Sequence, residues 1–144
     1  MTLAQTFSIC STFAAAGWLL LIVLPRWRVT ERLVISGFWS IALSVVYLVL
    51  MVRYMPGAEG GFGSLEEVRA LFGVEALLLA GWVHYLAFDL LAGAIEMKQA
   101  KEAGIPHLLM VPVLLLTFFL GPIGLVVFLI VKSIRLRRVA EVTG

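Results

Sequence analysis

The chain has 144 residues, of which 62% are hydrophobic and 14% charged, and its mean hydropathy is +1.05. These values exclude an ordinary water-soluble domain, and a formal net charge of +2 is too small to indicate nucleic-acid binding. The single cysteine, Cys10, lies in an apolar run, so we expect no disulfide framework and a packing role for this residue.

Four apolar stretches are long enough to cross a bilayer, which takes about 20 residues of helix. They cover residues 3–24, 33–52, 74–95 and 107–131. None shows the alternation of a transmembrane strand, and backbone groups in lipid must be paired within the segment. The sequence therefore predicts an all-α fold, a single domain 1–144 that is a four-helix transmembrane bundle in contact with membrane lipid.

The connection between the second and third stretches contains a helix signal of its own. Ser64 and Glu67 match a capping box, in which each side chain accepts from a free backbone N–H of the other residue. Leu65, Val68, Leu71 and Phe72 then share one face, so residues 64–72 form a short amphipathic helix. This interfacial helix is expected to brace the bundle at the membrane surface or to cover its mouth.

Small residues and prolines predict how the spans pack. Ser36, Ser40 and Ser44 repeat every four residues, which favours close helix approach or a homodimer interface; Gly37, Gly81 and Gly93 add contact points. In the fourth stretch Pro112 and Pro122 free the carbonyls of Leu108 and Phe118, and Gly121-Pro122 predicts a kink.

The basic residues give a weak topology signal if all four stretches cross the membrane. Arg26, Arg28, Arg32, Lys98 and Lys101 then share one side, and Arg53, Arg69, Lys132, Arg135, Arg137 and Arg138 share the other. The dense C-terminal group favours headgroup contact and a cytoplasmic location for both termini.

The third stretch carries Glu75, His84, Tyr85 and Asp89. Ionisable groups cost free energy within the membrane, so chains seldom keep them there without a function. At 100° per residue, Glu75, Trp82 and Asp89 lie within about 40° of one another, with Tyr85 nearby. His84 lies about 140° from Asp89 around the same axis. The two therefore face different neighbouring helices or opposite walls of one cavity.

His107 begins the fourth stretch and adds a second histidine. Antiparallel packing places it about 16 Å along the axis from His84, too far for both to bind one metal ion or haem iron. We therefore expect no metal and no cofactor. Asp89 is closer to His107 in depth, at about 9 Å, so a link through water or Tyr85 is open.

Several segments resemble the abscisic-acid-deficient-four-like family. They are GWVHYLAFDL at 81–90, GIPHLL at 104–109, LLTF at 115–118 and GPIG at 121–124, with FGSLE at 62–66 and RALF at 69–72 upstream. Named members of that family are plant chloroplast membrane proteins needed to make the allenic carotenoid neoxanthin from violaxanthin. The resemblance implies a membrane protein that handles a carotenoid or another long apolar isoprenoid. Because no plastid transit peptide is recognised, we expect a bacterial member, multi-pass in the cell inner membrane.

Three functions stay open. The first is binding of an isoprenoid or carotenoid, with Trp82, Tyr85, His107 and Glu75 as ligand contacts. The second is a cofactor-free, isomerase-type reaction on a carotenoid epoxide, with Asp89 as acid and His84 as base, or the reverse. The third is small proton-coupled transport, for which four spans would need a dimer to enclose a path.

Overall fold

The computed structural model describes residues 1–143, and every regular element within that range is helical. In chain order these are α1 (Leu3–Val23), α2 (Arg28–Thr30), the π-helical turn η1 (Glu31–Ile35), α3 (Phe38–Tyr54), α4 (Leu65–Gly73), α5 (Glu75–Glu102) and α6 (His107–Thr143). Four helical segments are long and apolar enough to span a membrane, namely α1, the run from α2 to α3, α5 and α6. The predicted all-α membrane fold is confirmed.

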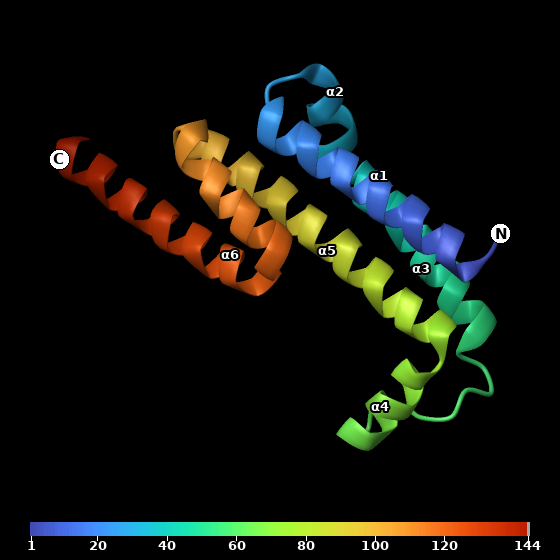
Figure 1. The fold of residues 1–144 in the computed structure, drawn as a ribbon. Helices are drawn as coiled ribbons and strands as arrows, with labels where there is room; N and C mark the ends of the chain where they lie inside the picture. The colour runs from blue at the N-terminus through green and yellow to red at the C-terminus, as the bar shows by residue number, and fades with distance from the viewer. Residues whose placement is uncertain (144) are drawn as a thin grey trace.

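Helix α5 is the centre of the bundle. It packs against α1 and α3 on one side and against α6 on the other (Figure 1). Two small residues let its neighbours approach closely: the Trp18 ring of α1 lies on Gly93, and the Phe72 ring of α4 lies on Gly81. Both glycines were expected as contact points, and both are.

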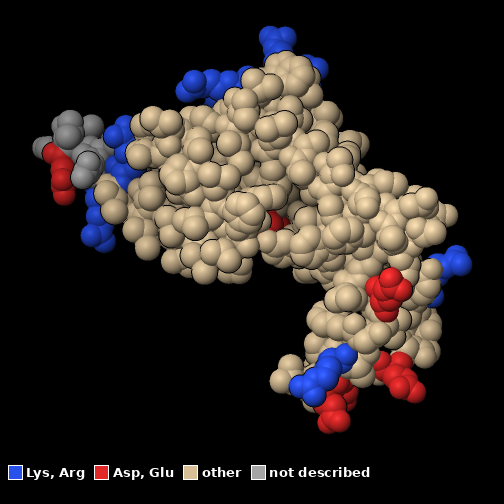
Figure 2. Space-filling model, in the orientation of Figure 1, with Lys and Arg blue, Asp and Glu red and all other residues tan. Residues whose placement is uncertain are grey.

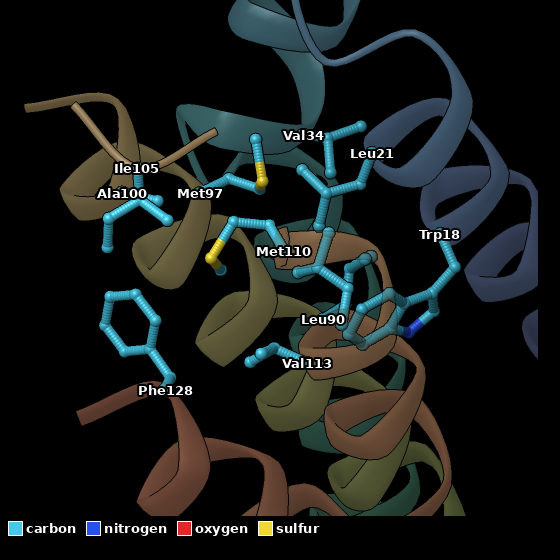
Figure 3. Close-up of a cluster of buried hydrophobic side chains, with 11 residues drawn as sticks. Trp18, Leu21, Val34, Leu90, Met97, Ala100, Ile105, Met110, Val113 and Phe128 are labelled. Carbon is cyan, nitrogen blue, oxygen red and sulfur yellow. The ribbon is translucent and has the colours of Figure 1, made fainter. Parts of the chain in front are cut away.

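One end of the core joins four elements. Trp18 and Leu21 of α1, Val34 of η1, Met97 of α5 and Phe128 of α6 belong to one cluster of buried side chains (Figure 3). Phe128 comes from the far half of α6 and still reaches the C-terminal end of α5, because the chain has turned back between them.

α5 is longer than the predicted third span, with 28 residues against the predicted range 74–95. Past Ile95 the helix has one inward and one outward face: Glu96 faces inward and is fully buried, while Lys98 and Lys101 face outward. At 1.5 Å per residue α5 is about 42 Å long, enough to cross the hydrocarbon core and reach both headgroup layers.

The interfacial helix forms nearly as predicted, at Leu65–Gly73. The Glu67 backbone N–H donates to Ser64 Oγ at 3.2 Å, but the Glu67 carboxylate accepts from the N–H of Gly63, at 2.9 Å, and not from Ser64. Half of the expected capping box is therefore present, and the loop before the helix takes the place of the other half. α4 packs on α5 through Leu71, which is buried, and Phe72.

Within the bundle, only one residue of the serine stripe is buried between helices, and its predicted use as a homodimer interface stays a prediction. Ser40 is buried, whereas Ser36 and Ser44 are exposed and their hydroxyls donate to carbonyls of their own helical turns. α1 and α3 are joined instead by Trp39, whose indole N–H donates to the Phe13 carbonyl at 2.8 Å.

α6 is interrupted as the sequence predicts, and more sharply than a kink. Leu120 (φ −138°, ψ 36°) and Gly121 (φ 1°, ψ −76°) are not helical. In Figure 1 the orange first half of α6 follows α5, and the red second half turns back toward the end where α6 began. The Lys132 ammonium donates to the Gln99 side chain at 2.8 Å, so Lys132 lies at the same end of the molecule as Lys98 and Lys101. The prediction that put Lys132, Arg135 and Arg137 at the opposite end is wrong; the Arg138 side chain lies outside the described part.

Candidate functional site

An open apolar groove runs along α5 between α1 and α4. It has a volume of about 700 Å³ and is lined by Leu3, Ala4 and Phe7 of α1, Phe72 of α4, and Glu75, Leu78, Leu79, Gly81, Trp82 and Tyr85 of α5. We call it the α1–α5 groove. Three of the six candidate residues, Glu75, Trp82 and Tyr85, therefore meet on one wall, as their spacing predicted.

Aromatic rings form much of that wall. The Trp82 ring lies 5.6 Å from Phe7 and 5.4 Å from Tyr85, centroid to centroid, with interplanar angles of 32° and 31°. The Trp82 indole N–H donates to Ser11 Oγ at 3.0 Å, which holds the ring against α1. Glu75 begins α5 at the open end, so the groove has a polar entrance and an apolar, aromatic interior.

Tyr85 connects the groove to the break in α6. Its hydroxyl lies 3.1 Å from the carbonyl oxygen of Phe118 and 3.3 Å from that of Phe119. Pro122 has no N–H to offer the Phe118 carbonyl, and the break at Gly121 removes the helical partners nearby. The freed Phe118 carbonyl was expected to need a partner, and the Tyr85 hydroxyl is that partner.

Asp89 packs directly on the break. A Cβ built on Gly121 would overlap Asp89 Oδ1 and would lie 2.8 Å from its Cγ and 2.9 Å from Oδ2, so only glycine leaves room for this carboxyl group. Asp89 Oδ2 is buried and accepts no hydrogen bond of ordinary geometry from the described residues, although the Tyr85 hydroxyl lies close enough to interact with the carboxyl group. An unpaired polar atom at this depth is unusual, because burial without a partner costs free energy.

A second carboxyl group lies one step further along the same face. Glu96 is fully buried, and both of its oxygens lie near the Thr117 hydroxyl, at 2.9 and 3.1 Å. Thr117 Oγ1 is also 3.1 Å from the Val113 carbonyl. The two acids of α5 that lie deep in the bundle, Asp89 and Glu96, thus both face the hairpin-shaped α6.

His84 lies on another side of α5. Its ring stacks on Phe88 at 4.6 Å and lies 5.4 Å from the Tyr47 ring of α3. It lines a separate pocket of about 250 Å³ between α3, α4 and α5. The structure therefore does not bring Asp89 and His84 to one ligand atom, and of the two arrangements left open by the sequence it has the one in which they face different helices.

His107 joins two helix ends. Its Nε2 lies 2.7 Å from the carbonyl oxygen of Ile22, in the last turn of α1, where carbonyls lack helical partners. It does not contact Asp89 or Tyr85 by any hydrogen bond in the described part of the chain. In residues 1–143, no three His, Cys, Asp or Glu side chains are grouped closely enough to hold a metal ion.

Comparison with known proteins decides the family. A family model described as ABA DEFICIENT 4-like matches residues 5–128, which include both buried acids, the break in α6 and every residue that lines the groove except Leu3 and Ala4. The chain belongs to the ABA DEFICIENT 4-like family. It is similar to Protein ABA DEFICIENT 4, chloroplastic, of Arabidopsis thaliana, with 24% identity over 139 residues that cover 91% of this chain and 62% of that relative. The chain thus spans less than two thirds of the length of that relative, and no solved structure matches it.

Sequence reasoning missed Glu96 in this family member, because the predicted span ended at residue 95. The signal was present. Glu75, Trp82, Asp89 and Glu96 are spaced by seven residues, which brings each within about 20° of the previous one on a helix. Extending the stripe by one step would have predicted a second inward-facing acid. Thr117 carried no comparable signal, because its partnership with Glu96 depends on how α6 packs.

Proposed function

We propose that this ABA DEFICIENT 4-like protein binds a long, apolar, oxygenated isoprenoid of the carotenoid type in the α1–α5 groove. The observation that carries the proposal is the groove itself: an open apolar channel of about 700 Å³, walled by Phe7, Trp82 and Tyr85 within the spanning helices. Ligand sites of this size are ordinarily apolar with a few polar groups. Because the groove is open, a rod-shaped ligand can occupy it and continue into the lipid.

Family membership supports the ligand class. The relative named ABA DEFICIENT 4 is chloroplastic, and the resemblance stated above connects the family with neoxanthin formation. A flat, conjugated chain stacks well on aromatic rings, which the groove supplies at Trp82, Phe7 and Phe72. Four apolar helices indicate a multi-pass membrane protein, and our proposal for its location is a bacterial inner membrane.

The test is a binding titration with two matched pairs of variants. Purified protein in mild detergent is titrated with a xanthophyll, and quenching of tryptophan fluorescence by the bound polyene is measured together with the shift of its absorption band. Ala4→Trp places a large ring in the groove and is expected to abolish binding. Val45→Trp, on the exposed face of α3, is the control and is expected to bind like the parent protein. Equal binding by both variants would contradict the proposal.

The second pair removes a ring instead of adding one. Trp82→Ala is expected to weaken binding about 10-fold or more, equivalent to the 1.4 kcal/mol or greater that a stacked aromatic contact and its buried area contribute. Trp27 is a suitable control because it is half exposed and does not line the groove, so Trp27→Ala should bind normally. An unchanged affinity for Trp82→Ala would remove the groove from consideration.

A cofactor-free, isomerase-type reaction on a carotenoid epoxide is the second candidate. The observation that favours it is Asp89, whose Oδ2 accepts no hydrogen bond of ordinary geometry in the described structure and which lies one helical turn beyond the groove residue Tyr85. Such a carboxyl group suits a general acid at an epoxide oxygen. His84 faces the other pocket, so its proposed role as the base finds no support in its position. If the protein is an enzyme, Asp89→Asn should retain xanthophyll binding and lose product, measured by chromatography of the pigments.

A further inference from the structure

The second half of α6 packs back against the first half. In an unbroken helix, residues seven positions apart are separated by about 10 Å. Here a Cβ built on Gly124 would overlap the hydroxyl, backbone nitrogen and Cα of Thr117. The two glycines of the break, Gly121 and Gly124, are both buried, and each touches a different inward-facing polar side chain. This is the tight apex of a helical hairpin and not a bend within one continuous helix.

Contacts further along show that the returning half reaches the end where α6 began. Phe128 is buried in the cluster that contains Ala100 and Ile105, and Lys132 bonds Gln99. A Cβ built on Gly104, in the turn between α5 and α6, would lie 3.8 Å from the guanidinium of Arg135. His107 and Arg135, the two ends of the apolar part of α6, therefore lie at one end of the molecule.

The length of the first half of α6 agrees with a helix that enters the membrane and returns to the same face. The first half, residues 107–119, is about 20 Å long, which is short of a hydrocarbon core about 30 Å thick. Irregular backbone at that depth is tolerated where protein satisfies it. The Tyr85 hydroxyl does so here, because its single O–H is shared between the Phe118 and Phe119 carbonyls.

This arrangement changes the distribution of positive charge. Figure 2 shows most Lys and Arg side chains at one end of the molecule and few at the other. Among the side chains that the structure describes, eight basic ones belong to the connection between α1 and α3, the C-terminal end of α5 and the returning half of α6, and two belong to α3 and α4. The eight are Arg26, Arg28, Arg32, Lys98, Lys101, Lys132, Arg135 and Arg137; the two are Arg53 and Arg69. The opposite end carries four acidic residues, with Glu59 in the loop before α4, Glu66 and Glu67 in α4, and Glu75 at the start of α5. The basic end also carries Glu31, Glu102 and Glu141, so the described basic side chains outnumber the acidic ones there by eight to three. Lys101 forms an ion pair with Glu31, and Lys132 donates to the Gln99 side chain.

We propose that α6 is a re-entrant hairpin, that the chain crosses the membrane three times, and that its basic end contacts anionic lipid headgroups on the cytoplasmic face. Anionic lipid is the partner that the charge of this end favours, because clustered Lys and Arg residues at a membrane boundary attract anionic headgroups. Such clusters also set the orientation of the protein in the membrane. The N-terminus then lies on the opposite face from the C-terminal part of α6. The expectation that both termini are cytoplasmic depends on four crossings. Of the two ends of the chain, three crossings leave only the C-terminal part of α6 on the cytoplasmic face.

Single-cysteine labelling tests the topology. In a Cys10→Ala background, Glu59→Cys, Glu102→Cys and Glu141→Cys place exposed thiols in the α3–α4 loop, at the end of α5 and near the C-terminal end of α6. Intact spheroplasts of a bacterial host are treated with a membrane-impermeant maleimide, and detergent-lysed samples give the maximum for each thiol. We expect labelling of residue 59 from outside and protection of residues 102 and 141. Four crossings would place 59 and 141 on one face and 102 on the other, and that pattern would overturn the proposal.

A second measurement tests the lipid. The protein is reconstituted in vesicles of phosphatidylcholine and phosphatidylglycerol in equal amounts, and the lipid that stays bound is counted by native mass spectrometry. The variant Lys132→Gln/Arg135→Gln should lose phosphatidylglycerol several-fold relative to the parent protein. The matched variant Arg53→Gln/Arg69→Gln removes the same charge from the other end and should retain it. Equal retention, or equal loss, in the two variants would refute the assignment of the basic end to anionic lipid.

Discussion

Replacement of Gly121 by alanine distinguishes the hairpin from a continuous fourth helix by the sign of its effect. In an exposed or unbroken helix, Gly→Ala is stabilising by about 0.5–1 kcal/mol. In the structure, the new Cβ would overlap Asp89 Oδ1 and lie 2.8 Å from Asp89 Cγ. The aspartate side chain is short, so it cannot swing clear without separating α5 from α6.

The expected magnitude follows from that overlap. Inserting a methyl group into a packed site costs about 1–3 kcal/mol. For a chain of this size, we expect Tm to fall by about 3–10 °C. Thermal unfolding in detergent is followed by tryptophan fluorescence, with monodispersity checked by gel filtration.

Two controls make the result specific to the contact. Gly73→Ala is the matched variant, because a Cβ there has no neighbour within 4 Å, and its Tm should be unchanged or slightly higher. The double variant Gly121→Ala/Asp89→Ala removes the obstacle and should recover most of the loss. A Tm for Gly121→Ala at or above that of the parent protein would refute the placement of Asp89 on the break.

Three further substitutions test the packing around the break and the core. Tyr85→Phe leaves two carbonyls of α6 without their donor and should lower the free energy of unfolding by about 1–3 kcal/mol, measured by chemical denaturation. An unchanged midpoint would show that water replaces the hydroxyl. Thr117→Val removes the partner of the buried Glu96 and is expected to lower the free energy of unfolding by a similar amount, about 1–3 kcal/mol. Thr117→Ser keeps the hydroxyl and should retain more stability. Equal loss of stability in the two variants would contradict the hydrogen bond. Gly93→Ala places a methyl group 2.6 Å from the Trp18 ring and should lower the free energy of unfolding by about 1–3 kcal/mol, with a shift in tryptophan emission. Unchanged stability and emission would contradict that contact.

The groove and the break could be predicted from the sequence to different degrees. Glu75, Trp82 and Tyr85 share a wall of the groove because helical periodicity alone fixes their relative angles. The break lies at Gly121-Pro122 because proline removes a helical hydrogen bond wherever the helix is placed. Glu96 was within reach of the same seven-residue spacing, once the helix was extended past residue 95.

The sequence by itself determined four long apolar helices, a short capped helix predicted at residues 64–72 and found at Leu65–Gly73, and the place where α6 is interrupted. These are local properties, since hydropathy, capping and the chemistry of proline act over a few residues. Only the tertiary structure decided that the chain reverses after the break, that Asp89 and His84 face different helices, and that Glu96 meets Thr117. Those outcomes depend on which surfaces fit together: a helix interruption specifies where a chain can turn, but the direction is set by packing such as Gly124 on Thr117 and Phe128 in the core.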